Sequence, residues 1–195
     1  MNTNTMVKVW DPLVRFFHWS LVITFFTAYI TEDNFLILHT YAGYTVLGLI
    51  LFRIIWGLIG TRHARFSNFV APPRVAWQYL KDTLRLRAKR YLGHNPAAGA
   101  MIILLLLSLI FTTLTGIATY GAVESAGPLG NWLGNIGERG EDLLEEVHEF
   151  FANFTVMLVA IHVSGVIIES LLHRENLVRS MFHGYKMATP DKSAK

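Results

Sequence analysis

The sequence predicts an all-α integral membrane protein, a bundle of four membrane-spanning helices with both termini in the cytoplasm and a cytoplasmic amphipathic helix between spans two and three. The first observation is composition: the 195 residues are 52% hydrophobic and 16% charged, whereas a soluble domain carries about 25% charged residues. The second is a set of four stretches without Asp, Glu, Lys or Arg, each close to or beyond the length of a membrane-spanning helix, at 16–31, 34–52, 91–123 and 150–168. The third is an uneven distribution of basic residues between the connecting segments. The spans use most of the chain, so 1–195 is expected to be a single domain.

The first two spans have recognisable ends. Span one, predicted at 12–30, begins at Asp11-Pro12, because proline is favoured at the first position of a helix. Its start carries charged and polar residues and no cleavage pattern follows it, so it is expected to remain as a helix. Span two, predicted at 36–59, follows the short acidic turn TEDN and ends in RIIWGLIG, where Trp56 marks a membrane interface.

The second half of the chain continues in the same way. Residues 73–91 alternate apolar with basic side chains, which predicts an amphipathic helix; the sequence leaves open whether it lies on the bilayer or only in a loop. Span three, predicted at 97–120, follows the capping pair Asn95-Pro96. A glycine-rich loop then leads to span four at 143–172, whose first turns are acidic and are expected to stand outside the membrane.

The basic residues predict the orientation. Of the seventeen Lys and Arg, two lie at or before the start of span one, nine lie within 53–90 and five lie from 174 onward, leaving only Arg139 on the other side. Basic residues near the ends of spans favour the cytoplasm. The opposite loops are acidic and carry Glu32, Asp33, Glu124, Glu138, Glu141, Asp142, Glu145 and Glu146. The net charge of +3 is therefore explained by topology and by contact with anionic membrane lipid, and no nucleic-acid partner is expected.

The chain contains no cysteine. Disulfides, thioether-linked haem, thiolate zinc sites and cysteine-ligated iron–sulfur clusters are therefore excluded as chemistry of this chain alone.

Four of the eight histidines sort into two levels of depth. His18 and His162 each lie twelve residues inward from the expected outer boundary, which corresponds to about 18 Å on a helix. His39 and His148 lie close to that boundary, and fourteen residues separate His148 from His162 on one face of span four. Each level thus receives one histidine from each of two helices, His39 with His148 on the outside and His18 with His162 on the inside.

Two histidines at each level suit a haem. A lone metal ion prefers three or four ligands, and no other ligand type accompanies these histidines at depth. A porphyrin supplies four ligands to its iron, so two axial imidazoles complete the coordination. The sequence therefore predicts two non-covalent, bis-histidine haems b, which would carry electrons and leave no position for oxygen. The alternative for any single histidine is a hydrogen bond from its ring to a backbone carbonyl.

Other residues are candidates for contact with the haems. Gly43 in span two and Gly116 in span three lack side chains and would let a flat macrocycle approach the backbone; close helix packing without a cofactor is the alternative. Arg15 and Arg53 are candidate partners for the propionates of the inner haem. Anchoring of the spans on the cytoplasmic side is the alternative for both arginines.

Four motifs resemble those of a known family. These are FFHW with His18, LHTYAGYTVLGLILFRIIWG with His39, GHNPAAG before span three and VHEFFANFTVMLVAIH in span four. Together they resemble the bacterial cytochrome b561 family and the b-type cytochrome subunits of membrane-bound nickel–iron hydrogenases over about residues 8 to 185. The resemblance implies a multi-pass protein of the bacterial inner membrane with two haems b, whose ligands are His18, His39, His148 and His162. His94, in GHNP, matches a family motif without a role that the sequence defines.

The function that the resemblance implies is electron transfer in a respiratory chain. The leading hypothesis is a quinol-oxidising cytochrome that carries electrons between ubiquinone or menaquinone and a periplasmic redox protein such as a c-type cytochrome, which the acidic loop at 138–146 could attract; a homodimer is a candidate assembly. The alternative is a haem-bearing anchor subunit of a periplasm-facing hydrogenase or dehydrogenase. The short turn TEDNF, where the hydrogenase subunits have a longer connection, favours the first reading. A divalent-metal transporter would need more acidic residues at mid-bilayer than Glu169 alone.

Overall fold

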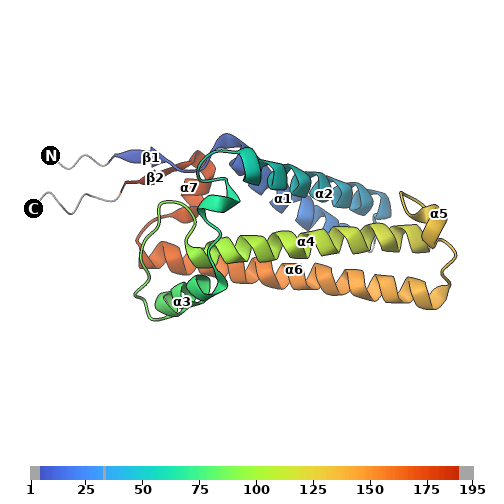
Figure 1. The fold of residues 1–195 in the computed structure, drawn as a ribbon. Helices are drawn as coiled ribbons and strands as arrows, with labels where there is room; N and C mark the ends of the chain where they lie inside the picture. The colour runs from blue at the N-terminus through green and yellow to red at the C-terminus, as the bar shows by residue number, and fades with distance from the viewer. Residues whose placement is uncertain (1–4, 33, 189–195) are drawn as a thin grey trace, which may run out of the picture. The chain divides into compact units, whose positions relative to one another are not determined.

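The computed structural model describes residues 5–32 and 34–188. It is 73% helical, and four of its helices are long and apolar enough to cross a membrane (Figure 1): α1 (Pro12–Thr31), α2 (Leu36–Ile59), α4 (Pro96–Val123) and α6 (Glu138–Leu172). The expected class, a helical multi-pass membrane protein, is confirmed. The orientation of the termini stays a prediction.

The boundaries of the four helices agree closely with the expectation, and the differences have local causes. α1 and α2 begin and end within one residue of the predicted positions. α4 continues to Val123, and α6 begins at Glu138, five residues before the predicted start at 143. Glu138 and Glu141 occupy the first turn of α6, where carboxylates interact favourably with the positive end of the helix dipole. The acidic segment is therefore stable as helix without burial in lipid.

The chain divides into two compact units, which are described separately. Of the described residues, unit 1 comprises 5–17, 55–100 and 162–188, and unit 2 comprises 18–32, 34–54 and 101–161. All four long helices contribute residues to both units.

Unit 2 has an apolar core formed by side chains from three of the helices. Phe25, Val46, Ile50 and Leu109 are buried together, and Ile50 is fully enclosed. Polar residues in this unit are mostly hydroxyls: Thr155 is also fully buried, and its Oγ1 lies 2.7 Å from that of Ser108. A short helix, α5 (Gly130–Leu133), lies in the loop between α4 and α6.

Unit 1 contains elements that the sequence did not predict. Strand β1 (Met6–Lys8) pairs antiparallel with β2 (Tyr185–Met187), with Val7 opposite Lys186, and Figure 1 shows the two strands side by side next to α7 (Leu177–His183). Asn176 caps α7 by accepting a hydrogen bond from the Arg179 amide at 2.7 Å. A single 3-10 turn, η1 (Phe66–Asn68), precedes α3.

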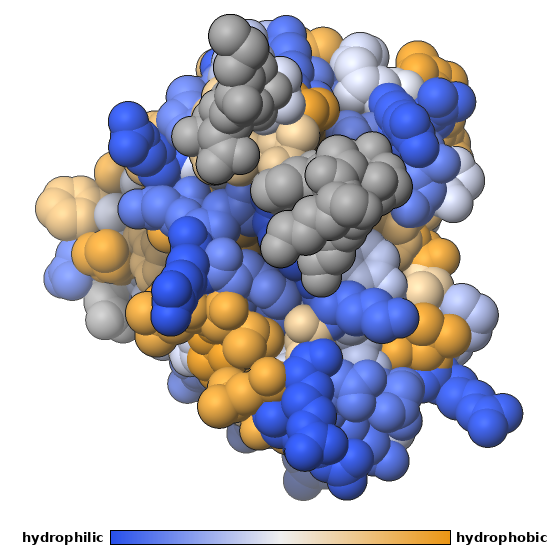
Figure 2. Space-filling model, turned by 90° about the vertical axis from the view of Figure 1, so that its left-hand side faces the viewer, coloured by the Kyte–Doolittle hydropathy of each residue, from blue (hydrophilic) through white to orange (hydrophobic). Residues whose placement is uncertain are grey.

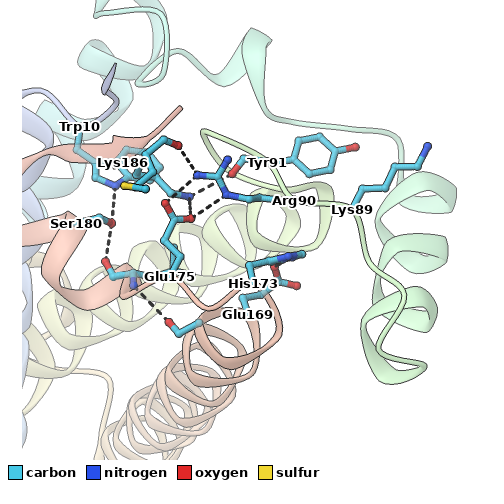
Figure 3. Close-up of polar contacts among 12 residues, drawn as sticks. Trp10, Lys89, Arg90, Tyr91, Glu169, His173, Glu175, Ser180 and Lys186 are labelled. Carbon is cyan, nitrogen blue, oxygen red and sulfur yellow. Dashed lines mark hydrogen bonds and ion pairs between the residues drawn. The ribbon is translucent and has the colours of Figure 1, made fainter. Parts of the chain in front are cut away.

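The amphipathic helix between spans two and three is present but shorter than predicted. α3 spans Pro73–Leu84, whereas the sequence predicted 73–91. Leu86 has a φ of 56°, which ends the helix, and the following residues make long-range contacts instead. Arg90 pairs with Glu175 at 2.9 Å, and the carbonyl of Tyr91 accepts a hydrogen bond from Lys186 (Figure 3). Residues 87–91 are not helical and are held by these long-range contacts, so tertiary structure overrides the helical periodicity here.

Candidate functional site

Unit 2 contains a cavity of about 260 Å³ to which all four long helices contribute. This is just below the range of ~300–1,000 Å³ for small-molecule and cofactor sites. Its lining includes His39 and Gly43 from α2, Gly116 from α4 and His148 from α6. We call it the histidine cavity. The structure thus brings together four of the residues that the sequence singled out.

The two histidines of the cavity are oriented by backbone carbonyls. His39 Nδ1 lies 2.9 Å from the carbonyl oxygen of Ala28, and His148 Nδ1 lies 3.0 Å from that of Thr112. A carbonyl can only accept, so each Nδ1 carries the proton and donates it. Each Nε2 is then left with a lone pair, which is the state that an imidazole needs to ligate a metal. From the sequence, a hydrogen bond to a backbone carbonyl is the alternative to metal ligation. Because this bond uses Nδ1 and ligation would use Nε2, one histidine can do both.

The separation of the two rings matches that of two ligands on one metal ion. The ring centroids of His39 and His148 are 6.1 Å apart and their planes are perpendicular, at 89°. Metal–imidazole bonds are about 2.0 to 2.1 Å long, and a ring nitrogen lies about 1.15 Å from the ring centre if ring bonds are about 1.35 Å. Two imidazoles on opposite sides of one ion would therefore have centroids about 6.3 to 6.5 Å apart, slightly more than the observed distance.

Both predicted glycines line the cavity, in different surroundings. A Cβ on Gly116 would lie 2.8 Å from Cε1 of His148, so the absence of a side chain lets the imidazole sit against α4. Around Gly43 no atom lies within 4 Å of the position that a Cβ would take. Gly43 therefore borders open space in the cavity, as a glycine under a flat ligand would.

Hydroxyl groups of α4 and α6 support His148, and the sequence interpretation missed them. The carbonyl of Thr112 accepts the hydrogen bond from His148. The Thr112 side chain has its Oγ1 2.9 Å from the Ser108 carbonyl and 3.2 Å from Thr155 Oγ1. Thr115 Oγ1 lies 3.2 Å from His148 Nδ1. The sequence signal for this set is the run SLIFTTLT in span three, where Ser and Thr recur at helical spacing.

The remaining predicted residues lie outside the histidine cavity. His18 belongs to unit 2, is partly buried and packs edge-on against Trp19 at 5.0 Å, whereas His162 belongs to unit 1 and is also partly buried. Arg53 is 3% exposed on α2 in unit 2. Arg15 lies in unit 1 and packs against Gly184. The roles predicted for these four residues stay predictions.

Three carboxylates line the histidine cavity. Glu32, Glu124 and Glu145 contribute to its lining and are exposed to solvent. Of the lining residues that the structure describes, none is Lys or Arg. Three of the acidic residues that the sequence placed in outer loops therefore meet at this cavity.

A chain of four apolar helices with two imidazoles facing one cavity defines a class, the helical membrane proteins that hold a metal-containing cofactor between their spans. Residues 9–184 match the family model described as prokaryotic cytochrome b561, and the chain belongs to this family. It is therefore a membrane electron-transfer protein that binds b-type haem.

Curated relatives cover nearly the whole chain. A protein of Azotobacter vinelandii named "Probable Ni/Fe-hydrogenase B-type cytochrome subunit" is 28% identical, covering 96% of this chain and 91% of the relative. A Cupriavidus necator protein of the same name is 29% identical over 91% of this chain and 86% of the relative. The alignment with the Azotobacter protein runs over 222 residues, more than the 195 of this chain, so that relative has residues without a counterpart here. No solved structure matches the chain.

The histidine cavity fits the b-type haem of this family. It offers two imidazoles whose Nδ1 protons are engaged by carbonyls, a separation of the ring centroids close to that of two ligands on one iron, and a glycine that borders open space. His39 and His148 would hold the iron, and the apolar residues of α1, α2 and α4 would contact the macrocycle.

Proposed function

We propose that this protein carries electrons across the bacterial inner membrane between the quinone pool and a redox partner on the periplasmic side, with two haems b, each held by two histidines. The observation that carries the proposal is the pair His39 and His148, whose rings are 6.1 Å apart with both Nδ1 atoms bonded to carbonyls. Each haem, when bound, supplies a one-electron couple between ferric and ferrous iron. Oxidation of one quinol releases two electrons and two protons, so the partner takes the electrons one at a time.

The protein's own residues would set the properties of the first haem. The carbonyls of Ala28 and Thr112 fix the ring orientations of His39 and His148 and raise the basicity of each Nε2. With His39 and His148 both bound to the iron, no ligand position would remain open, which would favour electron transfer over oxygen binding. The negative charge of Glu32, Glu124 and Glu145 would favour the ferric form and lower the reduction potential.

The second haem rests on helix register. His162 lies fourteen residues beyond His148 on the continuous helix α6, which is close to a whole number of turns. His18 lies on α1 at the corresponding predicted depth. We propose His18 and His162 as the ligands of this haem and Arg15 and Arg53 as candidates for its propionates.

The direction of the fold in the membrane follows from charge in this proposal. Basic residues at both chain ends and in 53–90 place these parts in the cytoplasm. The histidine cavity then faces the periplasm. The acidic segment 138–146 would attract a basic partner such as a c-type cytochrome, and a homodimer is a further proposed assembly.

A second candidate function is supported by the names of the relatives. These are hydrogenase cytochrome subunits, so the protein could instead be a haem-bearing anchor that connects a hydrogenase or dehydrogenase to ubiquinone or menaquinone. Purification under mild detergent separates the two candidates. A large enzyme subunit that stays bound in stoichiometric amount supports the anchor, and a cytochrome that purifies alone and oxidises quinol in proteoliposomes supports the shuttle.

The haem ligands are tested by counting haem per chain in histidine variants. The pyridine haemochrome of the wild-type protein should give two haems b per chain. His39→Ala and His148→Ala should each lose one, His18→Ala and His162→Ala should each lose the other, and His183→Ala should lose none. His183 is a suitable control because it lies in α7, outside the cavity, and its Nδ1 accepts a hydrogen bond from the Tyr185 amide. A wild-type count of one would contradict the second haem only.

A further inference from the structure

Helix α3 has one stripe of side chains that the protein buries and a second, apolar stripe that stays exposed. Ala76, Tyr79 and Thr83 form the buried stripe. Trp77, Leu80 and Leu84 form a second stripe at helical spacing, in which Trp77 is 59% and Leu84 71% exposed. We call it the exposed stripe. An amphipathic helix in a soluble protein would normally keep such side chains against the core.

The buried stripe fixes α3 at the end of a membrane-spanning helix. The hydroxyls of Tyr79 and Thr83 lie 3.1 and 3.2 Å from the carboxylate of Glu169, and the Tyr79 hydroxyl also lies 2.8 Å from the carbonyl of Lys89. Burial and the charge of Glu169 raise the pKa of Tyr79, so its hydroxyl stays protonated and remains a donor. Glu169 lies in the last turn of α6, which ends at Leu172. α3 is therefore held at the level where a spanning helix leaves the hydrocarbon and enters the headgroup region.

The segment after α3 is also fixed, which limits how far the helix can move. Arg90 lies 2.9 Å from Glu175, and its side chain also donates to the carbonyl of Met187. Figure 3 shows Arg90 directed into this cluster and Lys89 pointing away from it. Segments 60–72 and 85–95 join α3 to the spanning helices α2 and α4, so the helix is tethered to the bilayer on both sides.

Basic side chains flank the exposed stripe. Arg74 and Lys81 are exposed on the same helix, and Lys81 Nζ lies 5.5 Å from the centroid of the Trp77 ring. Arg85 and Arg87 follow the helix and are exposed as well. Figure 2 shows hydrophobic and strongly hydrophilic side chains next to one another on this end of the molecule. Tryptophan and leucine beside lysine and arginine are the composition of helices that lie in the membrane interface.

We infer that α3 lies in the membrane interface, with Trp77, Leu80 and Leu84 inserted between lipids and Arg74 and Lys81 in contact with anionic phospholipid headgroups. A second copy of this chain is a poor occupant of the same face, because the two positively charged surfaces would repel. The inference does not depend on the haems or on the electron-transfer partner.

Site-specific spin labelling tests the position of α3, since the chain has no natural cysteine. Leu84→Cys reports on the exposed stripe, Leu80→Cys is a second probe of it, and Gln78→Cys on the polar side of the same helix is the matched control. The full-length protein is reconstituted in nanodiscs with 30% phosphatidylglycerol, and collision of each label with oxygen and with a water-soluble nickel chelate is measured by power saturation. Labels at 84 and 80 should collide mainly with oxygen, and the label at 78 mainly with nickel.

Lipid charge and side-chain charge test the headgroup contact. Lys81→Gln should lower the ratio of inserted to water-exposed label at position 84 by about fivefold, because it removes one basic side chain from the anionic surface. Replacing phosphatidylglycerol by phosphatidylcholine should also lower this ratio. An unchanged ratio would overturn the role of anionic headgroups. Equal nickel accessibility at 84 and 78 would overturn membrane insertion, and a label at 84 protected from both reagents, even in detergent, would show that a protein covers the stripe.

Discussion

Buried polar groups differ in kind between the two units of the protein. In unit 2 they are mainly hydroxyls and imidazoles, such as Ser108, Thr155 and His148, which contact backbone carbonyls or one another, and Arg53 is the charged exception. In unit 1 they include charged groups, such as Asp11, Glu175 and Lys186, held in ion pairs and multiple hydrogen bonds. Neutral polar groups that are hydrogen-bonded to their own helices have a small free-energy cost within a bilayer. Charged groups have a large cost unless oppositely charged or hydrogen-bonding partners surround them. The polar groups of unit 2 therefore orient imidazoles, whereas those of unit 1 hold distant chain segments together.

The charged cluster of unit 1 joins three segments distant in sequence. Glu175 lies 2.9 Å from Arg90 and 3.1 Å from Lys186. Burial alone would raise the pKa of Glu175, but the hydrogen bond from Arg90 and the charge of Lys186 outweigh it, and the pKa lies below its ordinary value. Burial lowers the pKa of Lys186 in spite of the nearby carboxylate. The cluster therefore depends on having all of its members.

The largest expected effect is the loss of Glu175. Glu175→Ala would leave Lys186 and Arg90 close together without their carboxylate, which should destabilise unit 1 by about 3 to 5 kcal/mol. The stability is measured by thermal unfolding and by protease cleavage near residues 85–95. Adding Lys186→Met should restore part of the loss, because a fully apolar replacement removes the uncompensated charge. Wild-type stability in Glu175→Ala would contradict the claim that this cluster holds the three segments together.

The next effect is in unit 2 and concerns the fit of His148. Gly116→Ala should push the imidazole away from α4 and weaken its hydrogen bond to the Thr112 carbonyl. Loss of such a supporting contact typically costs about 10- to 100-fold in affinity for the metal group. Haem retention is measured by competition with apomyoglobin. Gly48→Ala is the control, since no atom lies within 4 Å of the Cβ position at Gly48; equal haem loss in both variants would contradict the close fit.

A smaller effect is expected at Asp11, which caps α1. Its carboxylate accepts hydrogen bonds from the Val14 amide, the Trp56 indole and the Thr61 hydroxyl. Burial raises its pKa, but these hydrogen bonds more than compensate, and the pKa is lowered. Asp11→Ala should destabilise unit 1 by about 1 to 2 kcal/mol, and Asp82→Ala, on the solvent side of α3, should have little effect.

The lowered pKa of Asp11 also predicts a pH dependence. The folded pKa lies below the unfolded value of about 3.9, so the stabilisation is complete at neutral pH and is lost as the pH falls through the folded pKa. The stability difference between the wild-type protein and Asp11→Ala should therefore shrink below about pH 4. A difference that is the same at pH 7 and pH 3 would show that the carboxylate charge plays no part.

The smallest effect concerns the carboxylates of the histidine cavity. Glu145→Gln removes a negative charge that favours ferric iron, so the reduction potential of the adjacent haem should rise by a few tens of millivolts, the size expected for a unit charge about 10 Å away at an effective dielectric constant of about 20, with allowance for screening. Redox titration followed by absorbance measures it. Asp82→Asn, on α3 in unit 1 and outside the cavity lining, is the control. A fall in potential would contradict the sign.

The sequence alone predicted the limits of the membrane-spanning helices and the common level of His39 and His148. Uninterrupted apolar stretches and the Asp11-Pro12 and Asn95-Pro96 signals determine the helix limits locally, and depth along the spans, with the topology predicted from charge, placed His39 and His148 at one level. The end of α3 could not be predicted, because Arg90 leaves the helical pattern to reach Glu175, more than eighty residues away. The pairing of β1 with β2 is equally non-local and involves only three residues in each strand.

The supporting contacts of the histidines were beyond prediction for a different reason. Ala28 and Thr112 orient the rings through backbone carbonyls, and a carbonyl carries no signature in the sequence. The Ser and Thr residues of α4 were visible, but their contact with Thr155 depends on how α4 packs on α6. The predicted acidic outer face contained the residues of the cavity lining without showing that Glu32, Glu124 and Glu145 would meet there.

The most direct test of the central claim, that His39 and His148 hold one haem between them, is the electron paramagnetic resonance spectrum of the oxidised protein. Two imidazole ligands with planes at 89° should give a low-spin ferric signal with strong g anisotropy, and this signal should disappear in His148→Ala while the signal of the second haem persists. A low-spin signal of this kind that survives unchanged in both His39→Ala and His148→Ala would contradict the claim.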